Sequence, residues 1–265
     1  MARLKGKLYK GVVGNTVLKG YRGEQLLIIK ADTPIAHMTE GTRKAAWEFG
    51  KASNLAASIR RSLGAVIGNF NDGTAVSRLN PEVLYCLNAV RDPQTDEYQY
   101  HIDSFAALAG FEFNINSRMR ANFFAIPQVS LNGNILEITL PELHIPKDIK
   151  FPKDIVYCKF IITVGMVDLV NGRLSALPSQ SVEIPYSYNP LSFPAHTFSF
   201  EPEAGCLCVT GFTLHYYEKT FAGVFLMNSK SFSPTAILNA QMMEGSVDPE
   251  RTNDWMEMEV VGKKK

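Results

Sequence analysis

The sequence predicts an α+β fold, mainly β: an N-terminal β-hairpin plus two helices, followed by an antiparallel β-sandwich. Three observations support this prediction. Glycines punctuate the first thirty residues, an apolar stripe at three- and four-residue steps follows, and period-2 runs dominate after about residue 96. With 265 residues, of which 46% are apolar and 20% charged, the chain can bury a sizeable core.

Residues 6–30 are expected to form the hairpin. β-prone runs at residues 12–13, 16–18 and 25–29 are separated by glycines, which permit tight turns. A segment this rich in glycine cannot bury much by itself. We therefore expect it to pair with another part of the fold or with another chain.

Two helices should follow the hairpin. The first is predicted over about residues 40–67, capped by Thr39 and ended by Gly68-Asn69, with the stripe Phe49, Ala52, Ala56, Ile59, Leu63 and Val66. The second is predicted to begin at Asn80 as N-cap, with Pro81 at the first helical position, and to run to about Val90.

The sandwich is predicted from period-2 runs with turn residues between them. The Asn132-Gly133 and Asn171-Gly172 dipeptides are the strongest hairpin turns. The expected strands are residues 98–102, 111–115, 128–131, 134–140, 155–168, 181–186, 197–201, 206–217, 223–227 and 236–242. We expect residues 1–95 to form a basic hairpin and helical region, 96–245 the sandwich, and 246–265 a polar tail that is mobile unless a neighbour binds it.

Charge is distributed unevenly along the chain. Residues 1–80 contain thirteen Lys/Arg and five Asp/Glu, whereas the remainder is net acidic. A basic N-terminal face suggests an acidic partner, either nucleic acid or a neighbouring copy of the same protein. The residues proposed for that contact are Lys5, Lys7, Lys10, Lys19, Arg22, Arg60 and Arg61.

Motifs for catalysis, metals and cofactors are missing from the sequence. The N-terminal glycines lack phosphate-loop spacing, no nucleophile motif occurs, and the five histidines are isolated. We therefore expect no enzyme, no cofactor and no metal site. Cys86, Cys158, Cys206 and Cys208 are expected to be buried or half-buried free thiols.

Location is constrained by two further patterns. No stretch approaches 18 consecutive apolar residues, so we expect no membrane span. The basic start lacks the apolar region that follows it in a Sec signal peptide. We therefore expect a protein of the cytoplasm or of an assembled particle.

One segment resembles a known family. Residues 11–23 read Gly-Val-Val-Gly-Asn-Thr-Val-Leu-Lys-Gly-Tyr-Arg-Gly. This resembles the opening of an uncharacterised family of small Bacteroidetes proteins, G-x-V-G-N-x-V-x-x-x-[WY]-[KR]-G. The chain departs from the family in having Tyr21 where Trp is commoner and in an insert around residues 96–115. The family has no established activity, so the resemblance implies no catalytic residues and favours a bacterial or phage-associated origin.

Three functions remain open at this point. The first is a non-enzymatic, self-assembling structural protein, a filament, virion or tail-like component whose basic hairpin docks on a neighbouring subunit. The second is a nucleic-acid-associated protein that binds phosphates through the basic region. The third is a carbohydrate- or ligand-binding β-sandwich that uses aromatic residues such as Tyr186, Tyr188, Phe193, Phe198 and Phe200.

Overall fold

The computed structural model describes residues 2–21, 23–29 and 39–258. The chain divides into two compact units, residues 1–46 (the N-terminal unit) and residues 47–265 (the main unit). The expected boundary at residue 95 differs from this division. Most of the helical region lies in the main unit, because its apolar side chains share a core with the sheet there.

The N-terminal unit contains a four-stranded antiparallel sheet in sequential order. Its strands are β1 (Arg3–Lys5), β2 (Leu8–Val13), β3 (Thr16–Tyr21) and β4 (Glu24–Ile29). The expected hairpin therefore forms, but as part of a larger meander. The turns between the strands contain Gly6, Gly14 and Gly23, each with positive φ. Glycine adopts this backbone conformation without the steric penalty of a Cβ atom.

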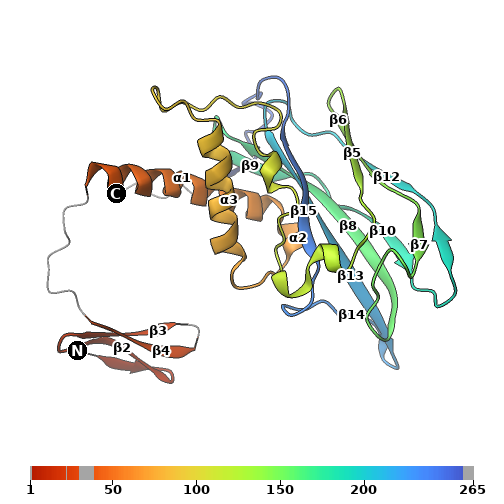
Figure 1. The fold of residues 1–265 in the computed structure, drawn as a ribbon, viewed down its shortest axis with the longest axis horizontal. Helices are drawn as coiled ribbons and strands as arrows, with labels where there is room; N and C mark the ends of the chain where they lie inside the picture. Colours follow the sequence, from red (N-terminus) through yellow and green to blue (C-terminus); the bar gives the residue numbers. More distant parts are fainter. Residues whose placement is uncertain (1, 22, 30–38, 259–265) are drawn as a thin grey trace. The chain divides into compact units, whose positions relative to one another are not determined.

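The main unit is built on a seven-stranded sheet (Figure 1). Its two central strands, β8 (Ile155–Asp168) and β13 (Leu207–Thr220), are antiparallel neighbours over most of their lengths. β13 also pairs with β14 (Gly223–Leu226) and β15 (Thr235–Met242). On the other side, β8 pairs with β9 (Arg173–Ala176) and β10 (Gln180–Pro185), and β9 pairs with β16 (Met256–Glu257).

Two smaller sheets complete the sandwich. One contains β5 (Gln128–Asn132), β6 (Ile135–Leu140) and β12 (His196–Phe200), and the other contains β7 (Leu143–Ile145) and β11 (Leu191–Phe193). Figure 1 shows β5, β6 and β12 on one side of the large sheet and the helices on the other. The expected class, a mainly β α+β fold with an antiparallel sandwich, is confirmed.

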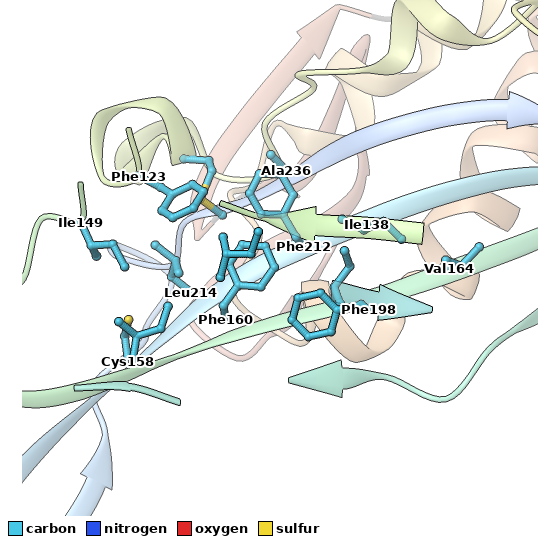
Figure 2. Close-up of a cluster of buried hydrophobic side chains, with 14 of the residues drawn as sticks. Phe123, Ile138, Ile149, Cys158, Phe160, Val164, Phe198, Phe212, Leu214 and Ala236 are labelled. Atoms are coloured by element: carbon cyan, nitrogen blue, oxygen red, sulfur yellow. The ribbon is translucent and has the colours of Figure 1, made fainter. Parts of the chain in front are cut away.

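Each face of the large sheet has its own hydrophobic core, because neighbouring residues of a strand point to opposite faces. Along β8, Cys158, Phe160 and Ile162 belong to the core shared with the small sheets. Val167 belongs to the core shared with the helices. Figure 2 shows Phe160 in the sandwich core with Phe198 and Phe212, whose ring centroids lie 5.8 and 5.6 Å from its own.

The first predicted helix is present but interrupted. α1 (Glu40–Ser62) is followed by α2 (Gly64–Ile67), and Gly68 ends α2 with φ of 53°. At the start of α1, the Thr39 Oγ1 accepts a hydrogen bond from the Thr42 amide at 3.2 Å, which confirms the predicted cap. All members of the predicted stripe are buried except Phe49, which is exposed.

The second helix begins earlier than predicted. α3 (Ala75–Ala89) contains Pro81 in its interior, so Asn80 is not the N-cap. Asp72 organises the start instead, because its Oδ1 accepts the Thr74 amide at 2.6 Å. Burial of Ala75 and Leu79 in the first turns offsets the backbone hydrogen bond that proline removes.

Glycines allow the helices to approach the large sheet closely. A Cβ atom placed on Gly165 of β8 would lie 2.2 Å from the Ser62 Oγ, and one on Gly211 of β13 would lie 2.9 Å from the Val66 Cγ2. Any other residue at either position would push the end of α1 or α2 away from the sheet.

Most of the predicted strands are present, and both Asn-Gly turns form hairpins, with Gly133 and Gly172 at positive φ. Two predictions are wrong. Residues 98–102 and 111–115 contain only isolated bridges, Arg91 with Tyr98 and Glu112 with Ala236. Tyr98 and Tyr100 pack partly against the core shared with the helices and Phe113 is buried in it, so each period-2 pattern reflects burial without a full ladder. Besides α2, the structure contains elements that were not predicted: three short 3₁₀ helices, Ala106–Leu108, Ile115–Ser117 and Met119–Ala121, and five strands, β1, β7, β9, β11 and β16.

Residues 246–258 of the predicted polar tail pack against the main unit, which contradicts the prediction that this segment is mobile. β16 pairs with β9, Thr252 has no exposed surface, and Trp255 packs partly against the sandwich core. Arg173 Nη1 donates to the Pro249 backbone oxygen at 3.3 Å, and Arg251 pairs with Glu203 at 3.0 Å. Ordinary side-chain contacts thus hold this polar segment. Residues 259–265 lie outside the described residues.

Candidate functional site

Among its described residues, the N-terminal sheet has no buried core of its own. Of the side chains described between residues 2 and 29, none is buried. Large apolar residues are instead exposed on every strand: Leu4, Tyr9, Val12, Val13, Tyr21, Leu26, Leu27, Ile28 and Ile29. So many exposed apolar side chains on one small sheet indicate an interaction site.

Both faces of the sheet contribute to this surface. In the ladder between β3 and β4, Val17 lies opposite Ile28 and Leu18 lies opposite Leu27. Because side chains alternate along a strand, Leu26 and Ile28 occupy one face and Leu27 and Ile29 the other. Their side chains are 41, 42, 69 and 79% exposed, respectively. A continuous apolar run is typical of a strand that is covered on both faces.

Side-chain hydrogen bonds hold the sheet together in place of a core. Gln25 lies opposite Gly20, which has no side chain to obstruct it. The Gln25 Nε2 donates to the backbone oxygens of Tyr9 at 2.9 Å and Lys19 at 3.1 Å, and its Oε1 accepts the Tyr9 amide at 2.7 Å. One side chain therefore links β2, β3 and β4.

The two units have opposite net charges. The N-terminal unit has nine Lys/Arg and three Asp/Glu, a net charge of +6. The main unit has eighteen Lys/Arg and twenty-three Asp/Glu, a net charge of −5. Residues 244–257 of the main unit contain five Asp/Glu and one Lys/Arg, and all five carboxylates are on exposed residues. Opposite net charges favour association between the two kinds of unit.

The seven proposed contact residues are divided between the two units. Lys7, Lys10 and Lys19 are exposed on the N-terminal sheet. Lys5 lies in β1 and Arg22 lies outside the described residues. Arg60 and Arg61 are in the last turn of α1, in the main unit.

The two α1 arginines lie in the main unit and differ in their surroundings. Arg60 is half-buried, and burial lowers the pKa of its guanidinium. The Arg61 Nη1 donates to the Glu257 backbone oxygen at 3.3 Å, which helps to hold β16. The basic candidate surface therefore consists of the N-terminal lysines.

A second candidate site is a groove at the open edge of the sandwich. It has a volume of about 510 Å³ and lies against β15 and the segment 119–127 that leads into β5. Its lining includes Met119, Phe123 and Phe212, which are buried, whereas Phe124 and Ile126 at the same groove are 55 and 81% exposed. Figure 2 shows Phe123, Phe212 and Ala236 of this lining within the sandwich core. The volume is in the range of small-molecule sites.

Arginines gather beside the groove. A neighbouring hollow of about 630 Å³ is lined by Arg78, Arg118 and Arg120, and it shares Gly110, Glu112 and Arg120 with the apolar groove. Arg78 is engaged, because its guanidinium donates to Asp72 at 2.7 Å and to the Glu112 backbone oxygen at 2.8 Å. Within the described ranges, the guanidiniums of Arg118 and Arg120 form no hydrogen bond or ion pair.

Glu112 holds the backbone between these arginines. Its Oε2 accepts the Met119 amide at 2.7 Å and its Oε1 accepts the Arg120 amide at 3.4 Å. Burial raises the pKa of Glu112, although these hydrogen bonds and the nearby Arg120 and Arg118 oppose that shift. The carboxylate thus fixes the turn that carries both arginines.

Aromatic residues of the third predicted function do not share one surface. Phe198 and Phe200 are buried, whereas Tyr186 and Tyr188 are exposed. The buried pair lies in the sandwich core, where aromatic residues of period-2 strands usually pack. They cannot form a stacking platform for a sugar.

The four cysteines are buried and free, as predicted. Burial raises the pKa of Cys86 to about 11 and those of Cys158 and Cys206 to about 12. His215 is half-buried against the edge of the Phe70 ring, and burial lowers its pKa. Across residues 2–21, 23–29 and 39–258, no group of three or more His, Cys, Asp or Glu is placed to hold a metal ion.

Sequence reasoning identified the lysines but missed the apolar residues beside them and the groove arginines. The run Leu26–Ile29 carried a usable signal, since four consecutive apolar residues in a short strand indicate cover on both faces. Nothing in the sequence around Arg118 and Arg120 signalled a site, because their approach to the groove depends on tertiary structure.

In the part of the chain that the structure describes, no helix has the length and apolarity needed to cross a membrane. No family model matches the sequence, and neither the curated proteins nor the solved structures include a match.

Proposed function

We propose that the protein is a self-assembling structural subunit whose N-terminal sheet docks on the main unit of a neighbouring copy. The observation that carries this proposal is a four-stranded sheet without a buried side chain among its described residues. A sheet of this size needs cover on a hydrophobic face for stability. The cover must come from a surface outside the sheet.

A second copy supplies that surface in this proposal. The N-terminal unit carries a net charge of +6 and the main unit −5, so the sheet of one copy and the main unit of another attract each other. Apolar residues lie on both faces of β4, and one docking surface covers only one face. A second contact is then needed, and head-to-tail contacts of this kind build rings or filaments.

The exposed edges of the sheet add to the attraction. β1 and β4 are the outer strands of the N-terminal sheet, and each has one edge without a ladder partner among the described strands. Strand addition to such an edge supplies backbone hydrogen bonds. A filament, virion or tail-like component is the class of particle that we propose.

The test is the mass of the full chain in solution, measured by light scattering after size exclusion at low and high salt. We expect assemblies larger than 29.4 kDa that dissociate as salt screens the charges. The double variant Leu27→Asp and Ile29→Asp should be monomeric at the same concentration, because it places charge on one exposed face. Val170→Asp, at an exposed position in the main unit, is the matched control and should still assemble.

A monomer for the unmodified chain at every salt concentration would contradict the proposal, because the sheet would then be covered within one copy. Persistence of the assembly in the double variant would also contradict it. The Lys10→Glu and Lys19→Glu variant isolates the electrostatic part. It should weaken the assembly most at low salt and change little at high salt.

Nucleic acid is the second candidate partner. Tyr9 and Tyr21 are exposed among the lysines of the same sheet, and bases stack on such rings. Binding of a single-stranded oligonucleotide should then weaken steeply as salt rises and be lost in the Lys10→Glu and Lys19→Glu variant. An unmodified chain that binds no oligonucleotide at low salt would remove this candidate.

A further inference from the structure

We propose that the groove at the open edge of the sandwich binds a small amphipathic anion, with its apolar chain among the aromatic residues and its carboxylate or phosphate head group at Arg118 and Arg120. The inference concerns the main unit alone and does not rest on the proposed assembly. It draws on the position of the groove, its lining and the state of the two arginines.

The groove lies where the two layers of the sandwich are open to one another. β15 is at one edge of the large sheet and β5 is at one edge of the three-stranded sheet. Ala236 and Leu238 of β15 line the groove together with residues 123–127 before β5. A ligand chain that enters here reaches Phe123 and Phe212, which are continuous with the sandwich core.

The apolar lining suits a hydrocarbon chain. Apart from Glu112 and Arg120, the side chains around the groove are apolar, and they come from the large sheet and from the segment that leads into β5. The exposed Ile126 and Phe124 enlarge the apolar surface at the mouth. Covering these side chains removes apolar area from water and so favours binding.

The arginines suit an anionic head group. Arg120 lines both the groove and the hollow beside it, and Arg118 lines the hollow. Among the described residues, neither guanidinium forms an ion pair or a hydrogen bond, in contrast to that of Arg78 next to them. A guanidinium binds a carboxylate or a phosphate through paired N–H donors, so both head groups fit the same positions.

The charge around these arginines singles out this part of the main unit. That unit is net acidic, but the hollow is lined by three arginines and two glutamates, Glu82 and Glu112. Both oxygens of Glu112 accept backbone amides, and among the described residues neither guanidinium is hydrogen-bonded to this carboxylate. A long-chain alcohol would make the same apolar contacts in the groove, but it has no negative charge to pair with the arginines.

The test is a calorimetric titration of the full chain with dodecanoate, dodecyl phosphate and dodecanol, each kept below the concentration at which it aggregates. We expect saturable binding of at least one of the two anions at one site per chain, at least tenfold tighter than binding of dodecanol. The variant with Arg118→Gln and Arg120→Gln should lose about tenfold in affinity for that anion, and its affinity for dodecanol should not change. Lys147→Gln, an exposed lysine outside the groove, removes one positive charge as a control and should bind like the unmodified chain.

A second variant separates the apolar contacts from the charge. Ile126→Asp at the exposed mouth should weaken binding of the alcohol and of the anions alike. Three results would overturn the proposal: no saturable binding of either anion, equal affinity for anion and alcohol, or unchanged anion affinity in the double arginine variant. Sedimentation with phosphatidylglycerol vesicles without binding of a free amphiphile would also overturn it, since the surface would then be a membrane contact. The carboxylate and phosphate arms identify which head group the arginines prefer.

Discussion

At the scale of single residues, the buried polar groups of the sandwich differ in how they are satisfied. Tyr216 has no exposed surface, and its hydroxyl has no hydrogen-bond partner among the described residues. In contrast, both polar atoms of the Asn228 side chain form hydrogen bonds. The Asn228 Oδ1 accepts the Tyr216 amide at 2.8 Å, and its Nδ2 donates to the Leu214 backbone oxygen at 2.8 Å and to the Ser233 Oγ at 3.1 Å.

Removal of the Tyr216 hydroxyl should therefore not destabilise the fold. We expect Tyr216→Phe to leave the free energy of unfolding unchanged or to raise it by up to about 1 kcal/mol, because a desolvated and unpaired hydroxyl is lost. Asn228→Ala should lower it by about 2 kcal/mol or more, because three backbone and side-chain groups lose their partner. Urea unfolding of the two variants measures the contrast, and a clear loss of stability in Tyr216→Phe would contradict it.

The buried thiols give the protein a dependence on alkaline pH. Burial raises the pKa values of Cys158 and Cys206 to about 12 in the folded chain, above the ordinary value of 9.0. The unfolded chain ionises first as pH rises, so the stability contributed by these thiols is complete below about pH 9 and is lost toward pH 12. Unfolding midpoints measured from pH 8 to pH 12 should fall, and Cys158→Ala should flatten that fall. A thiol reagent at pH 8 should label the four cysteines only in denaturant.

At the scale of elements, contact between helix and sheet depends on two glycines. Gly165 and Gly211 lie on adjacent strands and allow the end of α1 and α2 to approach the sheet. The period-2 pattern predicted both strands, and the Asn-Gly dipeptides predicted the hairpin turns at Gly133 and Gly172. The period-2 pattern gives no information about the distance between the helices and the large sheet. The close approach was therefore not predictable from residue types alone.

A single added methyl group tests this contact. Gly165→Ala should lower the free energy of unfolding by about 1–3 kcal/mol, because its Cβ would overlap the buried Ser62 side chain. Gly50→Ala in α1 is the matched control. A Cβ there meets no atom within 4 Å, so the same substitution should raise stability by about 0.5–1 kcal/mol through helix propensity. Equal effects at the two positions in thermal unfolding would show that the approach is unimportant.

The start of α3 illustrates where sequence signals compete. Asn-Pro-Glu is a strong N-terminal pattern, and it predicted a helix that begins at Asn80. The structure extends the helix to Ala75, because the apolar stripe continues toward the N-terminus and Asp72 satisfies the freed amide of Thr74. Tertiary burial thus outweighs the local preference of proline. The same rule explains why residues 98–102 alternate in polarity without forming a strand.

At the scale of the whole molecule, the fold class followed from periodicity, but the division into units did not. The sequence places the basic residues at the N-terminus, and the structure places Lys7, Lys10 and Lys19 on a sheet without a core. Arg60 and Arg61 share the charge but lie in the other unit. Charge along a sequence therefore located the candidate surface only in part, because spatial grouping depends on long-range contacts.

The pairing of β8 with β13 has a consequence for biosynthesis. Leu207 lies opposite Val167 and Glu218 opposite Ile155, so the ladder joins residues that are 40 to 63 positions apart. The helices α1 to α3 are translated long before β13 and β15, which supply much of the surface that covers them. During synthesis their apolar side chains stay uncovered while more than a hundred further residues are added to the chain. Contacts between residues so far apart in sequence also form slowly. We therefore expect the nascent chain to expose apolar surface that chaperones bind, and coexpression of a chaperone to raise its soluble yield.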